Sequence, residues 1–232
     1  MSGSVLVVQS AARQLPPLRL DEELRNIQQA LRGARYRAAL RIRVVPAARL
    51  EDLTGALREE IPTVLHVSGR ADGNGNLLFA TDDGGHAPLH SPGLLKLIDG
   101  FATPDLLAVV LNTCHSAPLA TELAERVGCA IGTDGLLDDT DAARFASEFY
   151  RNIGAGQSVG QAHLLAEAFL EANDSTSRPL PRLHLGANAI PAAAILPVGS
   201  EYRVPPQSDP VKPRGSNLWQ RLRAPRLPPG SH

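Results

Sequence analysis

The sequence predicts an α/β domain, a three-layer sandwich in which helices cover both faces of a mostly parallel central sheet. Short apolar runs alternate with longer segments of helical spacing between about residues 5 and 172. Most of these runs are continuous rather than alternating, which is typical of strands buried on both faces. Successive strands that are separated by helices join through right-handed crossovers, so we expect neighbouring strands to be parallel.

Five apolar runs are predicted as strands of the sheet. Residues 5–9 are rich in β-branched side chains, whereas residues 40–45 alternate arginine with apolar residues, as an edge strand does. The remaining strands are residues 63–67, 106–111 and 129–133. A Gly-Asn-Gly-Asn turn at residues 73–76 predicts a hairpin with one arm at residues 77–80.

Six helices are predicted from amphipathic spacing and from residues that favour helix ends. In the first, apolar residues at positions 20, 24, 27 and 31 share one face. Ser91 and Pro92 are typical of a helix N-cap and first turn, and Gly128 of a helix end. The predicted helices are residues 20–31, 50–60, 91–100, 118–127, 141–153 and 158–172.

Composition narrows the class of protein. The chain has 232 residues, of which 43% are apolar and 4% aromatic, so a core must be built from Ala, Val, Leu and Ile. A net charge of −1 argues against specific nucleic-acid binding. No apolar run approaches membrane-spanning length, and the first residues lack a signal-peptide pattern. Two cysteines make no disulfide framework, so we expect a cytoplasmic protein with reduced thiols.

The last residues differ from the rest. We expect a folded domain over residues 1–196 and a disordered tail over residues 197–232, which hold eight prolines and six basic residues. Within the tail, Leu218, Trp219 and Leu222 fall on one helical face. This patch fits either a short docking helix or the end of an unstructured linker.

The most informative stretch is residues 109–116, Val-Val-Leu-Asn-Thr-Cys-His-Ser. A buried strand ends there and helix-forming residues follow, which places Cys114 at the carboxyl edge of the sheet. A thiol in that position feels the positive end of the next helix and of free backbone N–H groups. Cys129 instead opens an apolar strand, and we expect it in the core.

Several motifs occur in one order along residues 5–189. They are Leu-Arg-Leu-Asp-Glu-Glu at 18–23, His-x-Ser-Gly at 66–69, Leu-Asn-x-Cys-x-Ser at 111–116, Ile-Gly at 131–132, and Gly-Gln-Ser-Val-Gly-Gln-Ala at 156–162. Asp139, Phe145-Ala146 and Phe149-Tyr150 lie between the last two. In this series the chain resembles the caspase-like cysteine peptidases and, among them, the bacterial CHAT domains. The resemblance implies a caspase-like fold with Cys114 at the nucleophile position.

The chain departs from that family where the catalytic histidine belongs. The family has Ser-Gly-His-Gly, and here Arg70 and Ala71 stand in place of the last two residues. A guanidinium can favour a nearby thiolate, but it is neither a base nor a useful acid. The resemblance further implies that the N–H of Ala71 serves an oxyanion hole, which alanine would strain if φ there were positive. It also places Gly69, Asn112 and Asp139 around the cleft.

Other imidazoles remain candidates for the missing base. His66 lies on the strand before Arg70, and a family histidine also stands there, which favours a structural role. His86 and His90 lie in and after the hairpin and can reach the site only by a loop movement. We expect His115 to point away from Cys114, because neighbours on an extended chain do so. Asp138 and Asp139 fit a helix cap better than a pocket, where they would select a basic side chain. We interpret Asp72, Asn74 and Asn76 as turn residues, with a metal site the weaker reading.

Three functions follow as alternatives. The first is a peptidase-type domain with impaired catalysis that binds a peptide or protein in bacterial signalling or defence, with a partner protein as the sensor. The second is an active cysteine endopeptidase that uses Cys114 with His66 or His86. The third is a purely structural interaction module with a filled cleft. None of them requires a metal or cofactor, and none involves a membrane.

Overall fold

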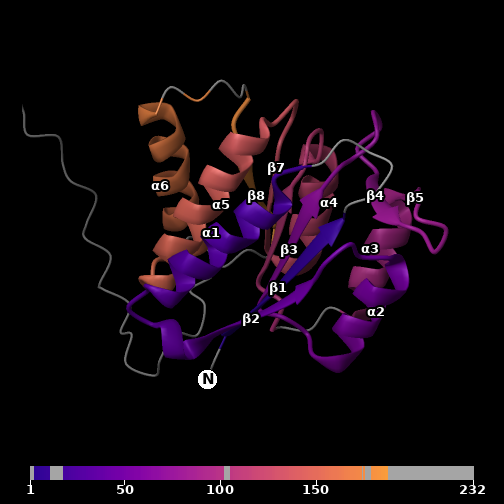
Figure 1. The fold of residues 1–232 in the computed structure, drawn as a ribbon, viewed down its shortest axis with the longest axis horizontal. Coiled ribbons are helices and arrows are strands. Elements are labelled where there is room, and N and C mark those ends of the chain that lie inside the picture. Colours follow the sequence, from indigo (N-terminus) through magenta and orange to yellow (C-terminus); the bar gives the residue numbers. More distant parts are fainter. Residues whose placement is uncertain (1–2, 11–17, 102–104, 174, 176–178, 188–232) are drawn as a thin grey trace, which may run out of the picture. The chain divides into compact units, whose positions relative to one another are not determined.

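The computed structural model describes residues 3–10, 18–101, 105–173, 175 and 179–187. Their centre is a six-stranded sheet in the order β2-β1-β3-β6-β7-β8 (Figure 1). The strands are β1 (Gly3–Ser10), β2 (Leu40–Val45), β3 (Val64–Gly69), β6 (Ala108–Asn112), β7 (Cys129–Gly132) and β8 (Arg182–Leu185). Every pair is parallel except β7 and β8. The predicted α/β fold with a mostly parallel sheet is confirmed.

Two groups of helices cover the two faces of the sheet (Figure 1). One group is α1 (Leu20–Arg32), α5 (Asp139–Gly154) and α6 (Val159–Ala172), which pack on one another and on one face. The other group is α2 (Leu50–Glu59), α3 (Ser91–Phe101) and α4 (Ala117–Val127) on the opposite face. A short 3₁₀ helix, η1 (Arg37–Ala39), precedes β2.

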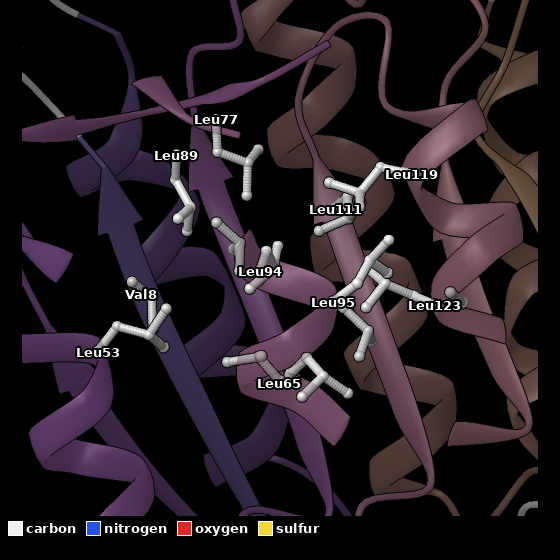
Figure 2. Close-up of a cluster of buried hydrophobic side chains, with 14 of the residues drawn as sticks. Val8, Leu53, Leu65, Leu77, Leu89, Leu94, Leu95, Leu111, Leu119 and Leu123 are labelled. Atoms are coloured by element: carbon white, nitrogen blue, oxygen red, sulfur yellow. The ribbon is translucent and has the colours of Figure 1, made fainter. Parts of the chain in front are cut away.

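The strands feed two separate cores because successive side chains point to opposite faces. Val5 and Val7 belong to the core under α1, α5 and α6. Leu6 and Val8 belong to the other core, which Figure 2 shows filled by leucines from β3, β6, α3 and α4. Both faces of β1 are buried along its whole length, which explains its continuous apolar run.

A two-stranded hairpin stands apart from the main sheet. It consists of β4 (Leu77–Ala80) and β5 (His86–Leu89), which are antiparallel. The first arm, β4, was predicted with these bounds. The second arm, β5, was not predicted, because three of its four side chains are exposed and the strand carries no apolar pattern. The sequence analysis also missed β8, a strand of four residues reading Arg-Leu-His-Leu.

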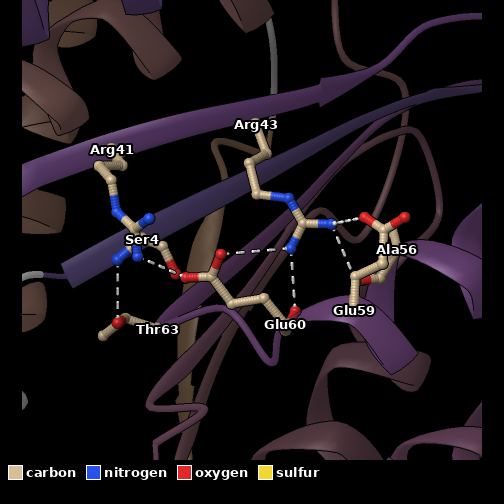
Figure 3. Close-up of polar contacts among 7 residues, drawn as sticks. All are labelled: Ser4, Arg41, Arg43, Ala56, Glu59, Glu60 and Thr63. Atoms are coloured by element: carbon tan, nitrogen blue, oxygen red, sulfur yellow. Dashed lines mark hydrogen bonds and ion pairs between the residues drawn. The ribbon is translucent and has the colours of Figure 1, made fainter.

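The strand predicted as an edge, β2, is one (Figure 1). Its arginines face α2, as Figure 3 shows: Arg43 donates to the Ala56 carbonyl oxygen at 3.0 Å and pairs with Glu59 at 3.0 Å, and Arg41 pairs with Glu60 at 2.9 Å. Such exposed pairs contribute about 0–1 kcal/mol each. They nevertheless place charge along an edge that would otherwise be open to strand pairing.

The contacts divide the chain into Met1–Ser200 and Glu201–His232. The second unit lies outside the described residues, and so do the predicted tail at 197–232 and its patch around Trp219. Within the described residues, no helix combines the length and the apolarity that crossing a bilayer requires.

Candidate functional site

A pocket of about 360 Å³ lies at the carboxyl edge of the parallel strands. Its walls come from the segments that follow β1, β3, β6 and β7, the location at which open α/β sheets bind ligands. All the residues that the sequence analysis selected for the site line it except His66. These lining residues are Gly69, Arg70, Ala71, Asn112, Cys114 and Asp139.

Cys114 lies in a turn between β6 and α4, and its side chain is half-buried. The backbone N–H of Leu137 donates to Sγ at 3.3 Å, and Sγ lies 3.8 Å from the Leu137 carbonyl oxygen. The buried Ser116 closes the turn, because its hydroxyl donates to the Thr113 carbonyl oxygen at 2.8 Å. The sulfur is therefore held against a backbone donor by residues on both sides of it.

The premise of the expectation for His115, an extended chain, does not hold. The chain turns at this residue with φ of 54°, and its N–H donates to the Gly135 carbonyl oxygen at 3.0 Å. His115 consequently lines the same pocket as Cys114. The alternation rule that placed it on the far side applies to extended chain, and β6 has already ended at Asn112.

Arg70 and Ala71 follow the end of β3 and form one wall of the pocket. The Arg70 carbonyl oxygen accepts from the Leu78 N–H at 2.9 Å, and Ala71 pairs with Leu77 as an isolated bridge. Ala71 is not among the described non-glycine residues with positive φ, so alanine fits this backbone without strain. Position 69, in contrast, requires glycine, because a Cβ there would lie 2.3 Å from the Ser10 carbonyl oxygen.

Asp72 organises the loop beside Arg70, as the turn interpretation predicted. Its carboxylate accepts from the N–H groups of Asn74 and Asn76 at 2.8 and 2.9 Å, and from the Asn76 side chain at 2.9 Å. The Asn76 side-chain bond is the main reason that the pKa of Asp72 is lowered. Among the described residues, no group of three or more His, Cys, Asp or Glu is arranged to hold a metal ion.

His66 lies beneath the pocket and is completely buried. Its Nε2 is 2.9 Å from Glu23 Oε1 and 2.7 Å from Ser68 Oγ, and Nδ1 is a buried atom without a partner among the described residues. These residue types are those of a Ser-His-Glu triad, but both partners share Nε2, so no relay through the ring exists. Neither nitrogen is hydrogen-bonded to Cys114.

The two aspartates that precede α5 have separate positions. Asp138 caps the helix by accepting from the N–H groups of Thr140 and Asp141 at 2.8 and 3.3 Å. Asp139 is half-buried and lines the pocket. The cap prediction is thus confirmed for Asp138, and Asp139 adds a carboxyl group to the pocket lining.

The other predicted candidate imidazoles do not line this pocket. His86 lines a separate hollow at the far end of the hairpin, together with Thr81, Asp82, Asp83 and Gly85. His90 is exposed, and its charge makes a minor contribution to lowering the pKa of Asp72. Of the histidines in the described part of the chain, His115 is the one that lines this pocket.

Cys129 has the surroundings that its predicted core position requires. It is 4% exposed, and its Sγ lies 3.1 Å from the Leu107 carbonyl oxygen. Burial raises the pKa of this thiol to about 11. Cys129 is therefore protonated at neutral pH and out of reach of solvent reagents.

Comparison with known proteins supports the fold. No protein-family model and no curated protein matches the chain. The structure is similar to a secreted C11 cysteine protease from Bacteroides thetaiotaomicron, solved in complex with an irreversible peptide inhibitor, with a TM-score of 0.53 and 11% identity. The match covers 74% of this chain and 60% of that chain, so the chain spans less than two thirds of the protease. A Staphylococcus aureus pyridoxal kinase in complex with ADP matches with a TM-score of 0.37 and 10% identity over 82% of this chain and 96% of its own, which supports no inference. The chain has the fold of a caspase-like cysteine protease.

Proposed function

We propose that this chain is a CHAT-type domain whose pocket binds a peptide segment of a partner protein and whose hydrolytic activity is weak or lost. The observation that carries the proposal is that Cys114 and Arg70 line one pocket at the carboxyl edge of the sheet. The position of the Cys114 thiol suits a nucleophile. Because residue 70 is arginine and not histidine, the pocket lacks the group that would transfer the proton. In this proposal the domain acts by binding a peptide, and a partner protein senses the signal in bacterial signalling or defence.

The chemistry of amide cleavage explains why arginine matters. Attack by the Cys114 thiolate on a peptide carbonyl forms the carbon–sulfur bond, and the amine can leave only when its nitrogen gains a proton. The Arg70 guanidinium stays protonated, so it stabilises negative charge without supplying that proton. General acid–base assistance is typically worth about 10²–10⁴-fold in rate.

The pocket walls indicate which peptides bind. Asp139, Asp72 and Glu23 line the pocket with Cys114, and so does Leu136, which is 72% exposed. Carboxylates favour a basic side chain, whereas Arg19 and Arg70 favour an acidic group on the opposite part of the ligand. We therefore propose a peptide with a basic residue next to the carbonyl that faces Cys114.

The test is to restore the imidazole. Arg70→His is expected to raise the hydrolysis of a basic peptide amide about 100-fold, because it returns a proton-transfer group to the pocket. Arg19→His is the matched control, since it adds an imidazole to the same pocket at an exposed position. Equal gains from both variants, or hydrolysis by the original chain that Arg70→His does not increase, would contradict the proposal.

The position of His115 favours a second candidate, an active endopeptidase with an unusual base. In this candidate His115, rather than His66 or His86, assists Cys114. It predicts measurable hydrolysis by the original chain and its loss in His115→Gln. Retention of that hydrolysis in His115→Gln would exclude it.

A further inference from the structure

A buried carboxylate on α1 gathers three polar side chains from two strands of the sheet. Glu23 is 4% exposed, and its Oε1 accepts from Ser68 Oγ at 2.8 Å and from Asn112 Nδ2 at 2.6 Å. His66 Nε2 lies 2.9 Å from the same oxygen. Burial and, as a smaller cause, the charge of Glu23 raise the pKa of the neighbouring Tyr150 well above its usual value. Hydrogen bonds from these side chains thus compensate the burial of the Glu23 carboxyl group.

Asn112 connects this cluster to the turn that holds Cys114. Its amide has two N–H groups, and both are used: Nδ2 donates to Glu23 Oε1 and, at 3.0 Å, to the Ala142 carbonyl oxygen in the first part of α5. A flipped amide would place the carbonyl oxygen of Asn112 against the carboxylate. Glu23 therefore fixes the orientation of the Asn112 side chain.

That orientation ties together the two elements that hold the thiol. Asn112 is the last residue of β6 and stands two positions before Cys114. Its bond to Ala142 anchors the start of α5, just after the segment in which the Leu137 N–H donates to Cys114 Sγ. A shift of Asn112 would move the cysteine turn and the Leu137 donor relative to each other.

We propose that Glu23 is a positioning residue for Cys114 and that it acts through Asn112. The inference rests on the proposed function only in taking Cys114 as the reactive group of the pocket. Glu23 accepts the Asn112 amide, Asn112 fixes the end of β6 against α5, and Sγ stays within reach of the Leu137 N–H. That N–H stabilises the negative sulfur as it reacts.

Two variants of equal charge separate positioning from electrostatics. Glu23→Gln keeps an acceptor oxygen for Asn112, whereas Glu23→Ala removes it, and both remove the negative charge. We expect iodoacetamide to label Cys114 about tenfold more slowly in Glu23→Ala than in Glu23→Gln, since loss of a buried neutral hydrogen bond is worth up to about this factor. Equal rates in the two folded variants would overturn the proposal. No peptide is used, so this result is independent of whether the pocket binds one.

The route through Asn112 is tested by a double-mutant cycle. In an Asn112→Ala background, the difference between Glu23→Gln and Glu23→Ala is expected to vanish. Should Glu23→Ala not fold, Asn112→Ala alone is expected to slow labelling by a similar factor. A persistent difference in the double variants, or a wild-type rate in Asn112→Ala, would overturn the proposal.

A matched control addresses general loosening of α1. Gln9 also anchors this helix, because its buried Nε2 donates to the Leu20 carbonyl oxygen at 2.7 Å, but it does not contact Asn112. Gln9→Met is expected to lower the thermal unfolding temperature without changing the rate of Cys114 labelling. A tenfold slower rate in Gln9→Met would show that α1 acts only by its overall stability.

Discussion

The two cysteines of this chain lie at opposite ends of neighbouring strands, and their surroundings differ accordingly. Cys114 follows the carboxyl end of β6 and lines a pocket, with a backbone N–H on its sulfur. Cys129 opens β7 at its amino end, is 4% exposed, and faces a carbonyl oxygen. The two thiols therefore differ because they lie at different ends of parallel strands. At the carboxyl end the thiol contacts a backbone donor and solvent, whereas at the amino end it is packed among apolar side chains.

Alkylation of the native protein is expected to separate the two thiols most strongly. With a pKa of about 11, Cys129 has about 100-fold less thiolate near neutral pH than an ordinary cysteine, and burial slows it further. We expect iodoacetamide at pH 7.5 to label Cys114 at least about 100-fold faster than Cys129, measured by peptide mass spectrometry. In urea the two rates are expected to converge. Equally slow labelling of both thiols in the native protein would instead support the structural module with a filled cleft.

Alkaline unfolding is expected to depend on Cys129. Above pH 9 the unfolded thiol loses its proton, whereas the folded thiol keeps it until about pH 11, so the unfolded state binds fewer protons and stability falls across this window. Two pKa units correspond to about 2.7 kcal/mol. Urea unfolding at pH 8 to 11 under reducing conditions is expected to show a correspondingly smaller loss in Cys129→Ala. In the control variant Cys114→Ala, the part of the stability loss that is due to Cys129 is expected to remain. An identical alkaline loss in Cys129→Ala and the original chain would be inconsistent with this burial.

The smallest expected effect concerns the loop that contacts the cysteine turn. Gly75 has φ of 80°, and a Cβ there would lie 2.7 Å from the His115 carbonyl oxygen, whereas Gly84 has φ of 82° and open space around it. Both alanine variants lose about 1 kcal/mol from the positive φ. We expect Gly75→Ala to lose roughly a further 1 kcal/mol and to change the labelling of Cys114 but not of Cys129. Equal stability of the two variants would show that the loop can move away from the added Cβ without a loss of folding free energy.

Local patterns were sufficient to predict most strands, the α-helices and several residues of the Cys114 pocket. The apolar run of β6 predicts a buried strand, and the glycine after α4 predicts the end of that helix. Strand β8 and the second hairpin arm were not predicted, because each has only four residues, most of them exposed or half-buried, and so carries no clear apolar pattern.

The parts of the site that escaped prediction depend on tertiary structure or on a single backbone angle. Glu23 and Asn112 are 89 positions apart, so their hydrogen bond has no local signature. The entry of His115 into the pocket wall depends on φ of 54°, which is uncommon for any residue other than glycine and has no signature in the local pattern. Among the residues lining the pocket, Leu137 contributes through its backbone, so its side-chain type gave no indication of the contact with Cys114.

The central claim is that the Cys114 pocket recognises a peptide, and saturation kinetics with a peptidyl electrophile test it most directly. A peptidyl chloromethyl ketone with a basic residue next to the reactive carbon is expected to modify Cys114 at a rate that saturates with its concentration, and to leave Cys129 unmodified in the native protein. An acidic residue at that position is expected to abolish the saturation. A rate that rises linearly over the whole accessible concentration range for both reagents would contradict the account.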